Sequence, residues 1–495
     1  IEYGLRNDFF GHLEKLSLRF FNEHKTGDLM AHATNDLNAI RMMVGPGVLM
    51  SLDAITLCVL VIYQMITKIS LNLTLVAIIP LPLIAIGGIF FGRAIRARFK
   101  DKQEAFAHMS EMVQENISGV QVVKAFVQET KEIKAFNETN KNNYDKNMRV
   151  IKLFAIMNPL AMLVTGLSIA IVLGYGGYMT MLGNITLGDF VAFTQYLLML
   201  VWPMIAFGWC INIMSQGLAS LSRFQNILDE KPEIIDEETV KQIDSIKGDI
   251  VIDNLTFNYP GSGLKELDNI SVTVNKGETL GIVGRTGSGK TTLVNMLLRM
   301  YNPPRGTIFI DDVDIMDIPL KVLRHSIGYV PQDNFLFSDT ISRNIAFGVI
   351  ETSDEYIECA AKNANVHDNI IEFSNKYATV VGERGVTLSG GQKQRISIAR
   401  ALIKDPAIMI LDDSVSAVDT NTEEQILNHI KEERKDKTTI IIAHRISTIQ
   451  NSDKIIVIDE GKIIESGTHD SLVEQKGLYY NMVEKQQLEK ELEKE

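Results

Sequence analysis

Nearly all the long apolar runs of the chain lie before residue 228, and four of them have the length of a membrane-spanning helix. A bilayer core about 30 Å thick needs about 20 mostly apolar residues in a helix, because lipid offers no partners for free backbone groups. The four predicted spans are 44–66, 71–91, 153–175 and 190–214. Only short links separate the first span from the second and the third from the fourth, so each pair is predicted to form a hairpin across the membrane.

Two further segments have helical spacing but are too polar for lipid. The segment at 100–152 follows a basic cluster that extends from Arg93 to Lys102, and positive charge beside a span favours the cytoplasmic side. It is predicted to project into the cytoplasm as two helices of about 25 residues, each nearly 40 Å long at about 1.5 Å per residue. The helices are expected to meet near Gly119, while the segment at 1–42 predicts a second projecting hairpin with a turn near Gly27.

Proline occurs inside the predicted spans. A proline lacks the backbone donor that continues a helix, so each one is expected to bend its span. Ordinary membrane-helix geometry accounts for such bends, and a hinge that serves transport is the alternative. The prolines concerned are Pro80, Pro82, Pro159 and Pro203.

The chain has 495 residues, which is too many for one compact core, and its composition changes after residue 228. We therefore expect a membrane domain at 1–228 and a charged strand-and-helix domain at 246–483. A linker at 229–245 would join them, and a charged, solvated tail would follow at 484–495. The chain starts at Ile1 without a methionine or a signal segment, which leads us to expect an N-terminal truncation.

Charge and cysteine content exclude two classes of protein. The net charge is −12, whereas a nucleic-acid-binding protein presents a basic face, so no nucleic-acid partner is expected. Cys58, Cys210 and Cys359 are far apart and have the spacing of neither a zinc site nor a disulfide scaffold.

A phosphate-binding loop begins at Gly284. Residues Gly284–Thr291 match the pattern GxxxxGK[ST], after a strand-like run and before a helix-like one. Glycines let backbone N–H groups close on phosphate oxygens, Lys290 meets the outer phosphates, and the Thr291 hydroxyl reaches Mg²⁺. The predicted ATP-binding residues here are Gly284, Thr286, Gly287, Ser288, Gly289, Lys290, Thr291 and Thr292.

A second nucleotide-site feature is the apolar run Ala407–Leu411, which ends in Asp412. A buried strand of this kind delivers a carboxylate to a phosphate-bound metal ion. GTPases, kinases and helicases share both features, so these alone leave the class of nucleotide-binding protein open.

Residues Leu388–Gln392 read LSGGQ and lie a short distance before the Asp412 strand. This segment is the signature of ABC proteins, and the whole chain resembles ABC exporters of the multidrug type. The resemblance implies a multi-domain protein: an all-α transmembrane bundle of the ABC exporter type followed by an α/β P-loop NTPase domain with an ABC signature subdomain. It also adds Ser389, Gly390, Gly391 and Gln392 to the ATP-binding residues.

The same resemblance implies roles for residues outside these motifs. Tyr259 is similar to the residue that stacks on adenine, Gln332 to a loop glutamine that touches Mg²⁺, and His444 to the switch histidine near the γ-phosphate. The metal ligands implied are Thr291, Gln332 and Asp412. Val381–Gly385 resembles the exporter-specific loop beside the signature, and Ser416–Asp419 the loop that crosses the dimer interface.

One position departs from the family pattern. The family has glutamate directly after the metal-linked aspartate, as general base for the attacking water, whereas this chain has Asp413. Aspartate is shorter by one methylene, about 1.5 Å, and a base must lie within about 3 Å of the proton it removes. Weak hydrolysis is therefore predicted at this site; the alternative is a tolerated acidic exchange with a compensating backbone shift.

The resemblance implies ATP-driven export of amphipathic or hydrophobic compounds across the cell membrane by alternating access, with a cytoplasmic ATPase domain and with ATP and Mg²⁺ as cofactors. Two cassettes pair head to tail, so the partners expected are a second half-transporter, the lipid membrane and a small hydrophobic substrate. Asp413 favours a heterodimer, and a homodimer is the alternative. A lipid flippase or peptide exporter stays open as an alternative function, and an ATP-gated channel is less favoured because no regulatory insert is present.

Overall fold

The computed structural model describes residues 2–80, 82–237, 240–382, 388–416 and 418–492. The chain divides into two units, each of which combines two segments of the sequence. The first unit comprises residues 1–14 and 24–231, and the second comprises 15–23 and 232–495. The N-terminal region thus contributes a short segment to the second unit.

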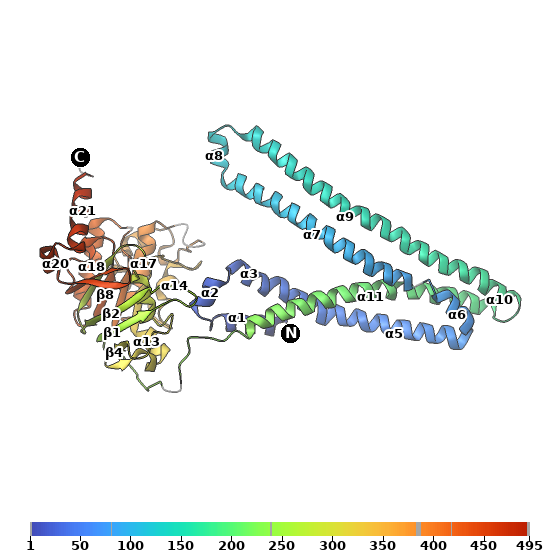
Figure 1. The fold of residues 1–495 in the computed structure, drawn as a ribbon, viewed down its shortest axis with the longest axis horizontal. Coiled ribbons are helices and arrows are strands. Elements are labelled where there is room, and N and C mark those ends of the chain that lie inside the picture. Colours follow the sequence, from blue (N-terminus) through green and yellow to red (C-terminus); the bar gives the residue numbers. More distant parts are fainter. Residues whose placement is uncertain (1, 81, 238–239, 383–387, 417, 493–495) are drawn as a thin grey trace. The chain divides into compact units, whose positions relative to one another are not determined.

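The first unit is entirely helical in the residues described (Figure 1). Short π-helical turns join α3, α4 and α5 into one continuous helix, Thr26–Ile69. This helix, Glu129–Met181 and Leu187–Leu228 are long and apolar enough to cross a membrane. The α-helices of the unit are α1 (Glu2–Leu13), α3 (Thr26–Ala31), α4 (Leu37–Met42), α5 (Val48–Gln64), α6 (Leu71–Ile78), α7 (Pro82–Ser118), α8 (Val120–Ala125), α9 (Glu129–Ile171), α10 (Gly177–Met181) and α11 (Leu187–Leu228).

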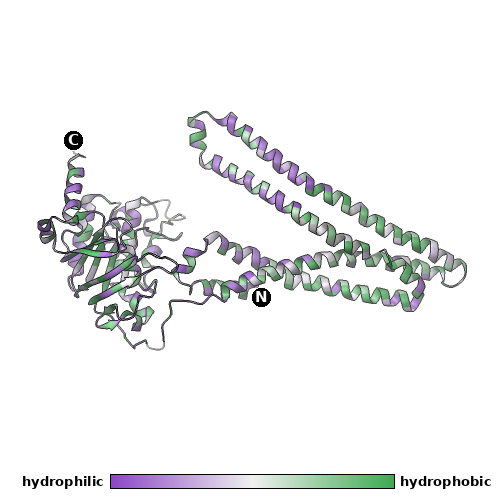
Figure 2. Ribbon diagram, viewed as in Figure 1, coloured by the Kyte–Doolittle hydropathy of each residue, from purple (hydrophilic) through white to green (hydrophobic). Residues whose placement is uncertain are grey.

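The polar projecting hairpin expected at 100–152 corresponds to the ends of α7 and α9 that meet at α8. Figure 1 shows α8 at the turn between these two long helices, and Figure 2 shows polar residues concentrated towards that turn. Gly119, where the turn was expected, is the residue that precedes α8. Hydrophobic residues dominate the opposite half of α9, which continues towards α10. Polarity therefore changes along single continuous helices.

The expected span 71–91 is not one continuous helix, because α6 ends at Ile78 and α7 begins at Pro82. Two prolines two residues apart remove two backbone donors from the same turn, and a proline is well placed at the first position of a new helix. The Leu83 N–H instead bonds the Pro80 carbonyl. The long helices α9 and α11, by contrast, continue through their single prolines.

An ion pair between the buried Asp36 and the half-exposed Arg223 holds the Thr26–Ile69 helix against α11. Both carboxylate oxygens of Asp36 accept hydrogen bonds from Arg223, and the Ser220 hydroxyl donates to the same carboxylate at 2.8 Å. The Nδ1 of His32 lies 2.6 Å from Asp36 Oδ2. Asp36 is buried, so the network satisfies a charge that cannot reach water.

Replacement of Asp36 by alanine is expected to destabilise this unit by about 1–3 kcal/mol, because Ser220 and Arg223 lose their shared acceptor. The lower part of the range applies because the Arg223 side chain is half exposed and water can solvate its charge. Thermal unfolding of the purified protein in detergent would measure the loss. Replacement of the exposed Asp28 on the same helix is the control, and an equal effect of both would contradict the assignment.

The second unit contains two sheets and the helices around them. A four-stranded sheet has the order β2-β1-β4-β5 and a six-stranded sheet the order β10-β9-β3-β8-β7-β6. The strands are β1 (Ile250–Phe257), β2 (Leu267–Val274), β3 (Thr279–Gly284), β4 (Ile308–Ile310), β5 (Val313–Asp314), β6 (Ile327–Val330), β7 (Ile408–Asp412), β8 (Thr438–Ile442), β9 (Lys454–Asp459) and β10 (Lys462–Gly467). The α-helices are α2 (Leu18–Glu23), α12 (Lys290–Leu297), α13 (Leu320–Ser326), α14 (Ile341–Ala346), α15 (Asp354–Asn363), α16 (His367–Ile371), α17 (Gly390–Leu402), α18 (Thr420–Glu433), α19 (Ile446–Ile449), α20 (His469–Gln475) and α21 (Leu478–Leu492).

The six-stranded sheet is parallel from β9 to β6, and only the edge strand β10 runs antiparallel. Every residue of β7 and of β8 is buried, as expected for strands covered on both faces. Because parallel strands end at the same edge, the residues that follow β3, β6, β7 and β8 gather there. This edge carries the phosphate loop, Gln332, Asp412 and His444.

The short helix α2 belongs to the second unit although it lies near the start of the chain. The Arg19 guanidinium donates to Glu233 at 2.7 Å, and the Ser17 hydroxyl donates to the other oxygen of the same carboxylate at 3.1 Å. Asn22 donates to the Tyr301 hydroxyl at 3.1 Å. The segment at residues 15–23 is therefore part of the second unit.

Candidate ATP site

The phosphate loop has a conformation that requires glycine. A Cβ at Gly284 would lie 2.0 Å from the Ile458 carbonyl oxygen, and one at Gly289 would lie 2.6 Å from the Glu266 oxygen. Gly287 and Gly289 have φ values of 78° and 101°, which lie in the region that L side chains rarely adopt. A loop of this form aims backbone N–H groups at one point in front of α12, where the positive end of the helix favours an anion.

Lys290 is buried beneath this loop, with 7% of its surface exposed. Its ammonium group donates to the carbonyls of Gly284 and Arg285 at 2.9 and 2.8 Å. Burial lowers the pKa of Lys290, while the nearby carboxylates of Asp412 and Asp413 raise it. The hydroxyl of the adjacent Ser288 is buried and has no hydrogen-bond partner among the described residues. Both side chains therefore fit a phosphate group, which would accept from each.

Asp412 ends β7 and is almost fully buried, with 2% exposed. Burial raises its pKa, and the side chains of Thr291, Lys290 and His444 lower it. Its Oδ2 atom is buried without a hydrogen-bond partner among the described residues. An unpaired carboxylate oxygen beside a threonine hydroxyl is a donor set that suits Mg²⁺, which prefers oxygen ligands.

Asp413 is held through its backbone and has a φ of 45°. Its N–H donates to the Ile442 carbonyl at 2.8 Å, and its own carbonyl accepts from the Ser416 hydroxyl at 3.0 Å. Ser416 in turn accepts from the Gln394 amide at 3.4 Å, which links Asp413 to α17. Aspartate is among the residues that tolerate this left-handed conformation best.

Tyr259 lies in an aromatic cluster rather than alone. Its ring packs edge-on against Phe257 and Tyr301, with ring centres 5.2 and 5.0 Å apart. Its hydroxyl donates to the Thr292 hydroxyl at 3.1 Å and so ties the ring to the first turn of α12. The side chain is half-buried, which leaves part of the ring for a nucleotide base.

The signature segment Leu388–Gln392 forms the start of α17. The Ser389 hydroxyl accepts from the Gln392 N–H at 3.3 Å, and the Gln392 side chain accepts from the Ser389 N–H at 3.0 Å. This reciprocal pair is a capping box, so the serine and the glutamine of the motif build the helix start that presents Gly390 and Gly391. The helix packs against α14, α15 and β6.

The structure thus brings part of the predicted site together. Four of the predicted residues shift the pKa of Asp412: Thr291, Lys290 and His444 lower it, and the carboxylate of Asp413 raises it. Gln332 follows β6 and His444 follows β8 at the same sheet edge, and both side chains are exposed. Within the loops expected from the resemblance, residues 383–385 and Ala417 lie outside the described residues.

One contact at this edge was not predicted. The side chain of Gln486, on α21, hydrogen-bonds the backbone on both sides of Arg445. α21 extends from Leu478 to Leu492, across the boundary at 484 beyond which we expected a solvated tail. The available signal was the spacing of Tyr479, Val483 and Gln486, which places them on one face of a helix.

The long apolar helices and the phosphate loop with its buried strand-end aspartate define a membrane protein with a P-loop ATPase domain. The family model of the ABC transporter transmembrane region matches residues 2–204, and the family model described as ABC transporter matches residues 267–416. The chain is 44% identical over 486 residues to the probable multidrug resistance ABC transporter ATP-binding/permease protein YheI of Bacillus subtilis, with 98% of this chain and 83% of that protein covered. The chain therefore belongs to the ABC exporters of the multidrug type.

Other comparisons agree with this assignment. The chain is 38% identical over 489 residues to the multidrug resistance-like ATP-binding protein MdlA of Escherichia coli, with 99% and 82% of the two chains covered. It is 38% identical over 479 residues to the ATP-dependent lipid A-core flippase of Syntrophus aciditrophicus, with 97% and 79% covered. A solved bacterial Atm1-family ABC exporter with ATP bound superimposes with a TM-score of 0.82 at 30% identity and covers 98% of this chain and 85% of that one. The fold is that of an ABC exporter, which works as a membrane-embedded dimer with cytoplasmic ATP-binding domains.

Proposed function

We propose that this chain is one half of an ATP-driven exporter of amphipathic or hydrophobic compounds. The observation that carries the proposal is the presence, in one chain, of long apolar helices, a complete phosphate loop and an intact signature segment. The names of YheI and MdlA support drugs as substrates. A lipid substrate is the second candidate, because a lipid A-core flippase is 38% identical over 479 residues.

At the ATP site, each residue has a task that follows from its position. The half-buried Tyr259 ring would stack on the adenine base. Lys290 and the N–H groups of the phosphate loop would bind the outer phosphates. Thr291, Asp412 and Gln332 would hold Mg²⁺, with the unpaired Asp412 oxygen as the strongest support. When bound, the ion would offset the charge of the phosphate oxygens.

Asp413 and the signature segment lead us to propose an unequal pair of halves. In a head-to-tail dimer, Ser389 and Gly391 of this chain would complete the site on the partner's phosphate loop. The site on Lys290 and Asp412 of this chain would hydrolyse ATP slowly, because its base is one methylene short of glutamate. This chain would then be the slow-site subunit of a heterodimer, with a homodimer as the alternative.

Transport would follow from closure of the cassettes. ATP between two cassettes stabilises the closed dimer, and the long helices α7 and α9 are continuous from their polar ends near α8 into their apolar halves. A movement at α8 would therefore reach the spans as a rigid-body displacement, and access would change from the inside to the outside.

Reconstitution into vesicles tests the proposal. The assembled transporter is expected to concentrate a hydrophobic dye against its gradient when ATP is supplied to the side of the cassettes, and to stop when ATP is withdrawn. Inclusion of a fluorescent lipid that can be quenched from one leaflet would distinguish a flippase. Flux that only follows the gradient, with or without hydrolysis, would contradict export and favour an ATP-gated channel.

A further inference from the structure

His444 lies in a short loop, 443–445, that joins β8 to α19. The side-chain amide of Gln486 spans this loop: its Nε2 donates to the His444 carbonyl at 2.7 Å, and its Oε1 accepts from the Ile446 N–H at 2.8 Å. One planar group thus satisfies both a backbone acceptor and a backbone donor two residues apart. A side chain that fills both roles at once must carry a donor and an acceptor side by side, as glutamine does.

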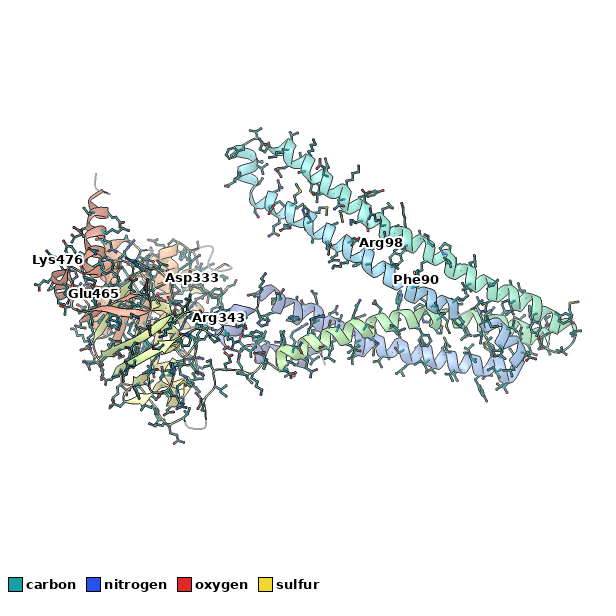
Figure 3. All side chains as sticks on the ribbon, viewed as in Figure 1. Phe90, Arg98, Asp333, Arg343, Glu465 and Lys476 are labelled. Carbon is teal, nitrogen blue, oxygen red and sulfur yellow. The ribbon has the colours of Figure 1, made fainter. Side chains whose placement is uncertain are left out.

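Gln486 is itself held in place, because α21 is anchored at its start. The Glu465 carboxylate of β10 accepts from the Leu478 and Tyr479 N–H groups, which are free donors in the first turn. Figure 3 labels Glu465 and Lys476, the residue at which the chain turns towards α21. Tyr479 is fully buried, and its hydroxyl lies 2.8 Å from His469 Nδ1.

The buried face of α21 continues from Tyr479 to Gln486. Val483 is buried four residues after Tyr479, and Gln486 follows three residues later, so the three side chains lie on one face of the helix. The helix packs against α19, which begins at Ile446. The next residue, Gln487, is exposed on another face and provides a matched position without this contact.

A second set of hydrogen bonds fixes the other side of the same loop. The Arg445 guanidinium donates to Glu423 at 3.2 Å, and the Thr448 hydroxyl donates to the other oxygen of that carboxylate. Glu423 is 3% exposed and lies in the first turn of α18. Because Arg445 is fixed through its side chain and residues 444 and 446 through their backbone, the loop has one orientation in which to present His444.

We propose that Gln486 is a positioning residue for ATP hydrolysis: it fixes the backbone of the His444 loop so that the imidazole faces the terminal phosphate. The inference rests on the proposed function and on the role near the terminal phosphate that the family resemblance implies for His444. It makes the C-terminal helix α21 part of the ATPase machinery rather than a tail. Without the two hydrogen bonds the His444 side chain samples orientations that do not support hydrolysis, whereas the groups that bind ATP in the ground state are unchanged.

The test is ATP hydrolysis by the purified full-length chain without its partner half, as a function of ATP concentration, because every site measured then contains His444 of this chain. Gln486→Ala is expected to lower kcat by about five- to twentyfold and to leave KM within about twofold, because Tyr259 and the phosphate loop are untouched. Gln486→Glu retains the acceptor for Ile446 but places an oxygen against the His444 carbonyl, so its kcat is expected to fall as well. Gln487→Ala is the matched control and is expected to behave as the unaltered protein.

A double substitution separates positioning from a merely structural role. If Gln486 acts through His444, the combination of Gln486→Ala with His444→Ala is expected to be no slower than His444→Ala alone. Amide exchange at Ile446 is expected to be faster in Gln486→Ala. A slow His444→Ala variant together with an unchanged kcat in Gln486→Ala would overturn this inference alone. Unchanged hydrolysis in His444→Ala would overturn the proposed role of His444, and the inference with it.

Discussion

Replacement of Gly391 by aspartate is expected to lower ATP turnover of the assembled transporter by about a hundredfold or more. Gly391 lies in the first turn of α17, where backbone N–H groups and the helix dipole favour a negative ligand. A carboxylate there would repel the terminal phosphate of an ATP bound by the partner's phosphate loop. Loss of one such preorganised interaction commonly costs a factor of about 10² to 10³. Turnover at saturating ATP, with equal amounts of folded transporter, is the measurement.

The matched control is Gly391→Ala, which adds bulk at the same buried position without charge. An acidic residue in a first helical turn interacts favourably with the helix dipole, but this position is buried, so both variants are compared at equal amounts of folded transporter. A large loss with aspartate and a much smaller one with alanine would support an electrostatic effect on a bound phosphate. Turnover within a factor of two of the unaltered protein would show that this signature segment completes no working site.

Comparison with Lys290→Ala reveals whether the two halves are equal. In a homodimer both substitutions alter both ATP sites, so both are expected to abolish turnover. In the proposed heterodimer, Gly391→Asp in this chain damages the competent site, while Lys290→Ala damages the slow one. The signature variant is then expected to be at least about tenfold slower than the Lys290 variant.

The phosphate loop and Asp412 could be predicted because each is defined by consecutive residues. The sequence Gly284–Thr291 contains the glycines whose absent side chains the loop requires, and the apolar run before Asp412 specifies a buried strand. Parallel strands then bring the two together without further information. The capping role of Ser389 and Gln392 follows from the same local rules, since serine and glutamine three residues apart form a capping box.

The hydrogen bonds from Gln486 to the His444 loop could not be predicted in the same way. Gln486 and His444 are 42 residues apart, and the hydrogen bonds depend on how α21 packs on α19. Because the residues after 484 are mostly charged, the sequence did not indicate that one face of α21, which includes Gln486, is partly buried. Tertiary packing, which composition does not encode, decided the role of this segment.

Proline positions show a similar limit. The local rule is identical at all four prolines in the predicted spans, since each removes one backbone donor. Pro80 and Pro82 lie in the same turn, and there the helix breaks between α6 and α7. Pro159 and Pro203 each interrupt only one turn of a helix of more than 40 residues. The remaining backbone hydrogen bonds on both sides of each proline keep the helix continuous. The spacing between prolines, rather than their presence, therefore determines whether the helix breaks or continues.

Replacement of Asp413 by glutamate is expected to raise ATP hydrolysis of the purified chain by about tenfold or more. General base catalysis contributes about 10² to 10⁴ to rate, and the longer side chain brings the carboxylate about 1.5 Å closer to the water. We expect no backbone shift to compensate for the short side chain, because hydrogen bonds to Ile442 and Ser416 hold the backbone on both sides of the Asp413 Cα. The rate of hydrolysis at saturating ATP is the measurement.

Asp413→Asn provides the control, since it keeps the length of the side chain and removes its capacity as a base. If Asp413 is a poor base, the asparagine variant is expected to hydrolyse ATP about as slowly as the unaltered chain. The φ of 45° at this position favours aspartate and asparagine over glutamate, so the glutamate variant is expected to lose about 1 kcal/mol of stability or less. A faster enzyme that is slightly less stable would show that activity at this site has been lost through the length of one side chain. A tenfold fall with asparagine and no rise with glutamate would instead identify Asp413 as a working base and favour the homodimer.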